Sequence, residues 1–525
     1  MESNILSILI FFPLLAILGM FIAYTLKQSD IVFKYIALFA TSVQLLLTVW
    51  LYFNFDPSVA LSSDISINPV KFAVQVPWIE NFNIQYFVGI DGLSAPLVFL
   101  TSLLMFICIL ASWNISKHVF AYFALFLLLD TGMMGVFLSL DFFLFYIFWE
   151  VMLLPMYFLI GIWGGPQREY AAIKFFLYTL FGSVLMLVGI LGLYFSCGKT
   201  FDIPELMRIA PEALQGVVWW GMSGIKVIWV LLFIGFAIKV PVFPFHTWLP
   251  LAHVEAPTAI SVILAGILLK LGVYGILRIN YGLMPDGVYW FSGALAFLGL
   301  INVIWGGLCA LAQTDLKKLV AYSSVNHMGY ALIGMAAVIA AGAANGTNFK
   351  AAQAGIGGAV FQMFNHGTIS AMLFILVGVI YERAHHRDID GFGGLASQMP
   401  VYAGITAVAF FAGLGLPGLS GFISEAMCFI GAFPVYRGIV IASTIGILLN
   451  AAYFLWAFQR IFFGELNEKY NKLPEINRLE LFTVVPLLVI TIFFGIYPAP
   501  YLDIIARTMD MIINSVVSLS TFAGM

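Results

Sequence analysis

The chain has 525 residues, of which 62% are hydrophobic and only 9% are charged, and its formal net charge is −3. A soluble protein of this length would need more charged residues to cover its surface, so the composition indicates a membrane protein. The slightly negative charge gives no basic surface, which excludes nucleic acid as a partner.

Apolar segments of spanning length recur from end to end, and we expect an all-α membrane protein with about fourteen transmembrane helices. The expected helices cover residues 4–26, 32–53, 93–113, 119–139, 141–162, 171–196, 226–246, 257–279, 289–312, 318–341, 353–381, 400–431, 438–463 and 477–497. Residues 500–525 are expected to form a short amphipathic or spanning tail. The first helix lacks a preceding basic run and a cleavage pattern, so we interpret it as a retained helix rather than a signal peptide.

The expected helices fall into four parts. These are N-terminal transmembrane helices over 1–118, two repeats over 119–279 and 289–463, and a C-terminal helix and tail over 464–525. If the N-terminus is outside, the inside loops hold more Lys and Arg than the outside loops. This bias predicts that both termini lie on the outer side of the membrane.

Two segments within the apolar pattern are expected to break their helices. In residues 236–246, Pro241 and Pro244 lack an N–H, and each clashes with the carbonyl four residues earlier. Residues 413–421 contain four glycines, a proline and a serine. Broken helices in separate halves predict two inverted repeats of a transporter core. The alternative is that the prolines only kink helices to fit their neighbours.

Four charged residues, Glu150, Lys239, Lys270 and Glu425, lie inside long apolar segments. Each costs roughly 2.5–3.5 kcal/mol on insertion scales, so such residues indicate an ion or proton path. We expect Glu150 to pair with Lys239. Pro241 and Pro244 free the carbonyls of Ala237 and Val240, and the Lys239 ammonium or water is a suitable partner for them. A static structural ion pair is the alternative for each charge.

Histidines extend this polar set. His327 and His366 follow polar residues within apolar segments. Because histidine as a residue type can relay protons, they are candidates for a proton relay or for hydrogen-bonded packing. The predicted polar line, parallel to the membrane, is formed by Glu150, Lys239, Lys270, His327, His366 and Glu425. His246, His253 and Glu255 include metal-ligand types, but without a fourth ligand they are better explained by a Pro-bounded turn.

The run from Phe236 to Thr258 resembles the core signature of the antiporter-like subunits of respiratory complex I. Residues 89–94, 162–165, 267–278 and 315–324 agree with this resemblance. Glu425 makes the chain most similar to the M-type branch, the relatives of mitochondrial subunit 4, because other branches typically carry Lys there. The tail is also too short for the lateral helix of L-type members. Leu251 departs from the pattern, since relatives often have a charged residue there.

The resemblance implies proton translocation in the cell inner (cytoplasmic) membrane, driven by quinone reduction elsewhere in a larger complex. It implies that Glu150 and Lys239 are the family's ion pair, Lys270 and His327 its central relay, and Glu425 its exit-side group. A subunit of a multisubunit sodium/proton antiporter and a membrane-bound hydrogenase subunit are the alternatives.

Redox cofactors are expected on other chains. The sequence has no Rossmann fingerprint or flavin motif, and its cysteines, Cys108, Cys197, Cys309 and Cys428, lack metal-ligand spacing. We therefore expect that this chain binds no cofactor or metal, and that NADH, flavin, iron–sulfur clusters and quinone belong to partner subunits. The resemblance implies L-like and N-like antiporter subunits and lipids as partners.

Overall fold

The structure, a computed structural model, describes residues 4–57, 72–219, 221–342 and 347–520. Most of this part of the chain is helical, and eleven of its helices are long and apolar enough to cross a membrane. The prediction of an all-α membrane protein is confirmed. The count of fourteen spans stays a prediction, because α3 (Ala95–Ala111) and α17 (Pro400–Gly413) are apolar but shorter.

The elements alternate long helices with short turns. The longer helices are α1 (Ile5–Thr25), α2 (Asp30–Asn54), α3, α4 (Val119–Leu138), α7 (Arg168–Ser196), α9 (Gly224–Lys239), α13 (Pro285–Leu311), α14 (Leu316–Ala336), α15 (Thr347–Ala384), α17, α18 (Ser420–Phe462), α19 (Arg478–Ile496) and α20 (Ala499–Ser520). The shorter ones are α5 (Phe142–Val151), α6 (Leu153–Trp163), α8 (Ile203–Ala213), α10 (Trp248–Glu255), α11 (Thr258–Ile263), α12 (Leu269–Gly275) and α16 (Leu395–Gln398). Two π-helical turns, η3 (Leu264–Leu268) and η4 (Ile276–Tyr281), flank α12, and 3-10 turns are η2 (Glu80–Phe82), η5 (Ala337–Gly342), η6 (Ile389–Gly391) and η7 (Glu468–Tyr470).

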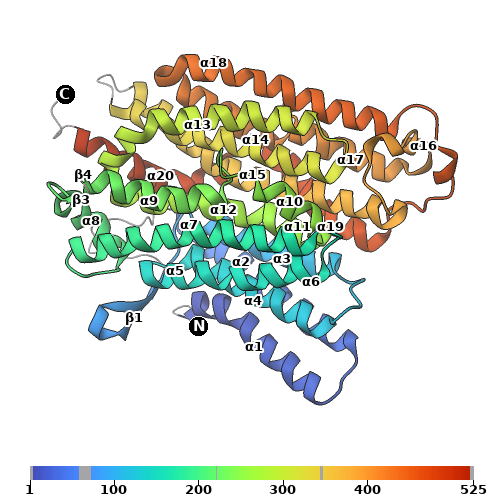
Figure 1. Ribbon diagram of the computed structural model, residues 1–525, viewed down its shortest axis with the longest axis horizontal. Helices are drawn as coiled ribbons and strands as arrows, with labels where there is room; N and C mark the ends of the chain where they lie inside the picture. Colours follow the sequence, from blue (N-terminus) through green and yellow to red (C-terminus); the bar gives the residue numbers. More distant parts are fainter. Residues whose placement is uncertain (1–3, 58–71, 220, 343–346, 521–525) are drawn as a thin grey trace.

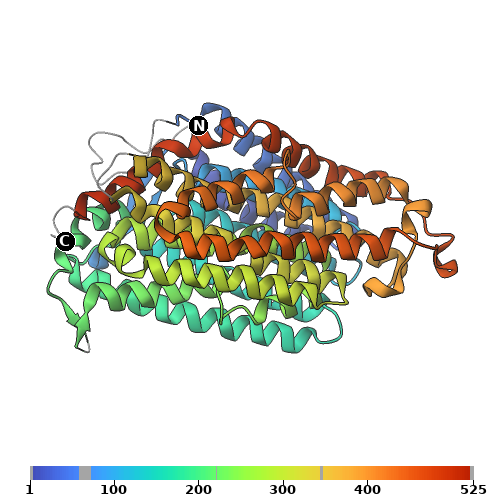
Figure 2. The ribbon, with the colours of Figure 1, turned by 90° about the horizontal axis from the view of Figure 1, so that it is seen from above.

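The long helices run side by side along the longest axis of the molecule (Figures 1 and 2). In Figure 1 they are stacked from α1 at the bottom, through α7, α9 and α13, to α18 at the top. The beginning of α1 and the end of α20 both lie toward the left end. The predicted outward orientation of that end stays a prediction.

The core lies around α11, α12 and α15. The apolar centres of the spans Thr258–Tyr281 and Asn348–Ala384 are fully buried, whereas those of α1, α2 and α19 are buried over only about a third of their residues or less. Exposed apolar residues along α1 and α19, such as Leu18 and Ile496, are suited to contact with lipid. The protected centre is therefore where polar groups can be shielded from lipid.

Both predicted helix breaks are confirmed. Helix α9 ends at Lys239 and α10 begins at Trp248, so the expected helix over 226–246 was too long. Helix α17 ends at Gly413 and α18 begins at Ser420, which divides the expected segment 400–431. The inverted relation of the two halves and the four-part division stay predictions.

Helix α18 consists of two helices that meet at a kink, so the expected separate helix over 438–463 is confirmed. The pair continues from Ser420 to Phe462, and its only non-helical residue is Tyr436, with φ −119° and ψ 46°. Pro434 lies just before this kink and cannot donate a backbone hydrogen bond. The chain therefore bends at this point, between the two helices.

Several smaller elements were not expected. Strand β1 (Val74–Ile79) pairs antiparallel with β2 (Ile84–Val88), and β3 (Val218–Trp219) pairs with β4 (Met222–Ser223). The amphipathic helix α8 lies at the same end as β3 and β4 (Figure 1). The expected tail forms α20, which buries Ile505 and Ile513, while its last five residues, 521–525, lie outside the described residues.

Candidate functional site

The six predicted site residues lie on six helices that follow one another across the stack. Glu150 lies on α5, Lys239 on α9, Lys270 on α12, His366 on α15, His327 on α14 and Glu425 on α18. In Figure 1, α5 lies low in the stack, α9 and α12 lie near its middle, and α15, α14 and α18 follow above them. A path through these residues therefore crosses the helices, and its direction parallel to the membrane stays a prediction.

The centre of the site is a contact between Lys270 and His366. Both side chains are buried, and Nζ lies 2.5 Å from Nδ1. The ammonium also donates to the carbonyl of Ala265 in the π-helical turn η3. A close approach of the helices allows this contact, because a Cβ at Gly367 would lie 3.0 Å from the Gly266 carbonyl oxygen.

The next contact joins His327 and Glu425. His327 Nδ1 lies 2.9 Å from Glu425 Oε1, and both side chains are buried. The His327 ring centroid is 5.8 Å from that of His366, at an interplanar angle of 45°. Four of the predicted residues therefore form one continuous group, Lys270–His366–His327–Glu425.

The second helix break shapes the space around Glu425. Gly415 has φ +81°, a conformation that favours glycine, and a Cβ there would lie 3.0 Å from Glu425 Oε2. Asn365 Nδ2 donates to the Ser420 carbonyl at 2.9 Å and to Ser424 Oγ at 3.1 Å, which anchors the start of α18. The glycine-rich sequence thus brings the backbone close to the carboxylate.

Glu150 and Lys239 are neighbours but not an ion pair. They interact electrostatically, yet they are absent from the ion pairs within 4.0 Å among the described residues. Lys239 Nζ and Glu150 Oε1 are buried without a hydrogen-bond partner. The ammonium faces the rings of Trp149 and Phe175, at 5.2 and 5.6 Å from their centroids. The expected direct pairing is therefore wrong for this conformation.

The expected binding of Lys239 to freed carbonyls is also wrong. The Ala237 carbonyl accepts a hydrogen bond from Val242 N at 2.8 Å. The backbone of the broken segment therefore satisfies this carbonyl itself. The Pro241 carbonyl accepts from Asn302 Nδ2 on α13 at 3.1 Å. The ammonium therefore lies against two aromatic faces and near Glu150.

Helix α5, which carries Glu150, is fixed at its start by Asp141. Its Oδ1 accepts from the N–H groups of Phe143 and Leu144, each at 2.9 Å, and its Oδ2 accepts from Gln85 N at 3.0 Å. Burial raises the pKa of Asp141 to about 6, and the three N–H donors lower it in part. This cap orients the first turn of the helix.

Two histidines between Lys239 and Lys270 were underestimated from the sequence. His253 is fully buried on α10, stacks on Phe374 at 4.5 Å, and has no hydrogen-bond partner on either ring nitrogen. It interacts electrostatically with Lys270. His246 Nε2 accepts from Trp305 Nε1 at 3.3 Å, and its Nδ1 has no partner.

The placement of His253 and Glu255 corrects the expected turn, since both lie on helix α10. Among the described residues, no three His, Cys, Asp or Glu side chains are grouped so that they could hold a metal ion. Two buried, unpartnered ring nitrogens instead indicate a site suited to water. His253 could not be singled out from sequence, because its neighbours come from other helices.

A polar pocket of about 180 Å³ lies at the loop end of this region. It is lined in part by Glu255, Lys317 and Arg387. Lys317 Nζ donates to the Ala256 carbonyl at 2.6 Å, and Arg387 Nη1 donates to the Val254 carbonyl at 2.9 Å. Since Val254 follows His253 directly, the pocket reaches the end of α10 on which His253 lies.

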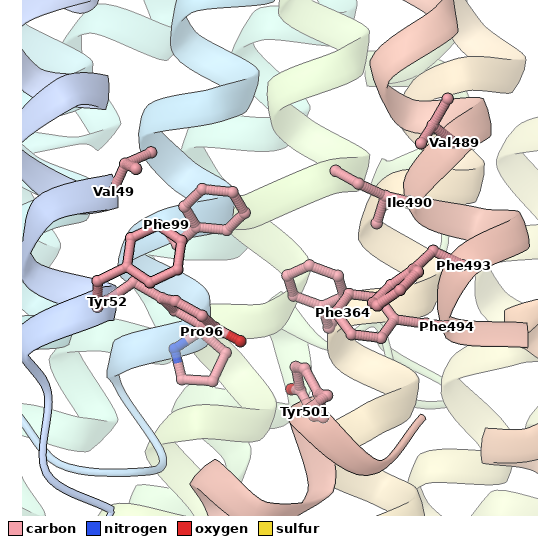
Figure 3. A pocket seen from close by; sticks show the side chains of 11 residues that line it. Val49, Tyr52, Pro96, Phe99, Phe364, Val489, Ile490, Phe493, Phe494 and Tyr501 are labelled. Carbon is pink, nitrogen blue, oxygen red and sulfur yellow. The ribbon is translucent and has the colours of Figure 1, made fainter. Parts of the chain in front are cut away.

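A second pocket of about 360 Å³ is almost wholly apolar (Figure 3). Its walls come from α2, α3, α15, α19 and α20, and include Phe99, Phe364, Phe494 and Tyr501. Phe364 is on α15 near His366, but the pocket contains no titratable group of the polar line. We therefore exclude it from the candidate path.

Other buried charges lie away from the six residues. Arg278 Nη2 and Nη1 contact Asp91 Oδ1 and Oδ2 at 2.6 and 2.8 Å, which makes a buried ion pair between η4 and the start of α3. Asp130 on α4 is fully buried and interacts with the side chain of Gln44 on α2. Neither Asp91 nor Asp130 was predicted from the sequence to be a buried acid.

Residues 139–450, which include all six predicted site residues, match the model of the NADH:quinone oxidoreductase/Mrp antiporter transmembrane family. The chain belongs to this family. It is 41% identical to NADH-quinone oxidoreductase subunit M of Rhodobacter capsulatus over 521 residues, 98% of this chain and 97% of that protein. It is 37% identical to F(420)H(2) dehydrogenase subunit M of Methanosarcina mazei over 527 residues, 99% of both chains.

The fold agrees with this assignment. A chain in the structure of respiratory complex I from Thermus thermophilus with bound NADH has a TM-score of 0.82, 26% identity and 99% coverage of both chains. The family resemblance inferred from the run Phe236 to Thr258 is thus confirmed. The roles of the six site residues stay predictions.

Proposed function

We propose that this chain is the M-type, proton-translocating subunit of a respiratory NADH:quinone oxidoreductase complex. Full-length similarity to M subunits supports the assignment. The observation that carries the proton-moving role is the continuous buried group Lys270–His366–His327–Glu425. Such titratable groups are costly to bury inside a membrane, so their presence there favours a role in transport.

Proton transfer along this group requires only small movements. The Lys270 ammonium gives a proton to His366 Nδ1, which lies 2.5 Å away. A water molecule then links the unpartnered His366 Nε2 to the neighbouring His327 ring. His327 passes the proton from Nδ1 to Glu425 Oε1 across 2.9 Å. Each step moves one proton from its donor to its acceptor, so the total charge of the group is unchanged.

Glu150 and Lys239 act as a second charge pair with two arrangements. In the open arrangement of the structure, Lys239 Nζ and Glu150 Oε1 lack partners. Closing the pair would favour the ammonium, and opening it would favour release of the proton from Lys239. Water around His246 and His253 connects this release to Lys270.

Uptake occurs through the polar pocket near Lys317, and release occurs beyond Glu425. The pocket lies beside α10 and contains polar and charged groups suited to hold water. Both Lys317 and Lys270 act electrostatically on His253. This interaction supports proton loading next to the central lysine.

The driving reaction belongs to partner subunits. We expect NADH, flavin, iron–sulfur clusters and quinone on those chains, and L-like and N-like antiporter subunits beside this one in the inner membrane, with both termini of this chain on the outer side. The relative from Methanosarcina mazei belongs to an F(420)H(2) dehydrogenase by name. The electron donor is therefore a separate question from the proton path.

The test is to replace Lys239 and Glu150 singly by alanine in the complete complex reconstituted in liposomes. Quinone reduction and proton uptake are measured together. We expect normal assembly and a lower proton-to-electron ratio for both variants. Lys226→Ala is the matched control, because Lys226 is an exposed lysine at the start of the same helix. An unchanged ratio in Lys239→Ala and Glu150→Ala would contradict the proposal.

A further inference from the structure

Asn302 on α13 connects the first helix break to the second half of the chain. The side chain is fully buried. Its Oδ1 accepts from Phe243 N at 2.8 Å, and its Nδ2 donates to the Pro241 carbonyl at 3.1 Å. The same Nδ2 also lies 3.5 Å from the Val325 carbonyl on α14. One side-chain amide thus contacts both the break and the helix that carries His327.

The backbone at the break requires such a partner. A helix interrupted at membrane depth leaves N–H and carbonyl groups that neither lipid nor the helix itself satisfies. Asn302 satisfies one of each, at Phe243 and Pro241. One turn later on α13, Trp305 Nε1 donates to His246 Nε2 at 3.3 Å. The face of α13 therefore holds the segment between Lys239 and α10.

Helices α13 and α14 are packed through their backbones. A Cβ at Gly299 would lie 2.9 Å from the Gly329 carbonyl oxygen, and one at Gly329 would lie 2.7 Å from the Gly299 carbonyl oxygen. A Cβ at Gly306 would lie 2.6 Å from Asn326 N. Such contacts leave little freedom for one helix to slide past the other. A displacement of α13 is therefore passed to α14, which carries His327.

The second break is held differently. Asn365, which binds the Ser420 carbonyl, lies on α15 beside His366. This anchor stays within the second half, whereas Asn302 reaches from the second half to the first. The two asparagines have similar local tasks, but only Asn302 joins the Lys239 segment to the helix of His327.

We propose that Asn302 is a positioning residue that couples the state of the first broken helix to the His327–Glu425 pair. When the Glu150–Lys239 pair opens or closes, the break moves and Asn302 transmits this movement through α13 to α14. The inference rests on the proposed proton-moving function. Asn302 itself carries no proton, because an amide side chain does not titrate.

The main test uses Asn302→Leu in the complete complex. Leucine has a similar size but makes none of the three hydrogen bonds. We expect quinone reduction to continue, the proton-to-electron ratio to fall to that of Glu425→Gln, and amide exchange at Phe243 to become faster. In the double variant with Glu425→Gln, the ratio should fall no further. A normal ratio in Asn302→Leu, or an additive further loss in the double variant, would overturn the coupling role.

Two further variants keep the test decisive. Asn280→Leu is the matched control, because Asn280 is also fully buried and donates to the Trp229 carbonyl of α9 at 3.0 Å, within the first half. It should leave the ratio unchanged, and an equal loss there would show a general structural effect and overturn the proposal. If Asn302→Leu does not assemble, Asn302→Ser replaces it, since serine is too short to reach both helices. A normal ratio in Asn302→Ser would also overturn it.

The coupling and the proposed function fail in different ways. If Glu425→Gln lowers the ratio but Asn302→Leu does not, the polar path is supported and the coupling is wrong. If Glu425→Gln leaves the ratio unchanged, the proposed path itself is wrong, and a loss in Asn302→Leu can no longer be assigned to it. Both results count against the coupling.

Discussion

Lys270 and His366 face each other between α12 and α15, with Nζ 2.5 Å from Nδ1. The same imidazole lies 5.8 Å, centroid to centroid, from that of His327. His366 is therefore the link between the central lysine and the His327–Glu425 pair. Any proton that moves between them through side chains passes this ring.

His366→Gln should lower proton pumping several-fold while the complex still assembles. Glutamine keeps a polar side chain for Lys270 but cannot accept and release a proton near neutral pH. The measurement is the proton-to-electron ratio of reconstituted complex. His386→Gln is the control, because His386 lies in a loop, where it stacks on Phe392 and bonds Tyr470. Equal ratios in both variants would remove His366 from the path.

The buried pair Asp91–Arg278 should be structural. Removing one partner leaves an uncompensated charge, which costs about 3–5 kcal/mol. Arg278→Leu and Asp91→Asn should therefore each reduce the amount of assembled complex, whereas the double variant should assemble better than Arg278→Leu. Blue-native electrophoresis with activity staining measures this. A double variant that is worse than both single variants would argue against charge compensation.

Asp141 should make stability depend on pH. Burial raises its pKa from 3.8 to about 6 in the folded protein. The folded state thus binds the carboxyl proton of Asp141 more tightly than the unfolded state does. The resulting stabilisation is complete below the unfolded pKa and is lost as pH rises through about 6. An asparagine side chain at this position would keep the Oδ1 acceptor without titrating.

The prediction is that Asp141→Asn destabilises the complex more at about pH 4.5, which lies between the two pKa values, than at about pH 7, which lies above both. The thermal unfolding temperature of purified complex, compared with wild type at each pH, measures the difference. A difference that is the same at both pH values would mean that Asp141 does not titrate in this range.

The helix breaks could be predicted because their causes are local. Pro241 lacks an N–H, and Gly415 supports a left-handed backbone conformation. These properties belong to single residues and need no knowledge of neighbours. The same local property of Pro434 accompanies the kink between the two helices of α18.

The contacts within the site could not be derived in the same way. Lys270 and His366 are 96 positions apart, and His327 and Glu425 are 98 apart. Their types and apolar surroundings identified them as candidates, but which groups touch depends on helix packing. The expected direct contact of Glu150 with Lys239 is absent from this conformation for the same reason, since aromatic rings lie next to the ammonium.

Asn302 was missed because an isolated asparagine in an apolar segment has no distinctive pattern. Its importance follows from partners at Pro241 and Phe243, which lie about sixty positions earlier. His253 was assigned to a turn because its proline-rich surroundings suggested one. Its unpartnered ring nitrogens become visible only when the helices are in place.

Glu425 provides the most direct test of the proposed path. It is the last titratable group of the continuous buried set and contacts His327 at 2.9 Å. Glu425→Gln keeps the shape and the hydrogen bonding but cannot carry a proton. Glu425→Asp keeps the acid on a shorter stem, and Glu425→Lys keeps a titratable group of opposite charge.

The decisive measurement is the proton-to-electron ratio of these three variants in the reconstituted complex. The account predicts a strong loss in Glu425→Gln, partial retention in Glu425→Asp, and a higher ratio in Glu425→Lys than in Glu425→Gln. Assembly, followed by electrophoresis, should be similar for all three. A near-normal ratio in Glu425→Gln would contradict the account, because it would show that protons leave by another route.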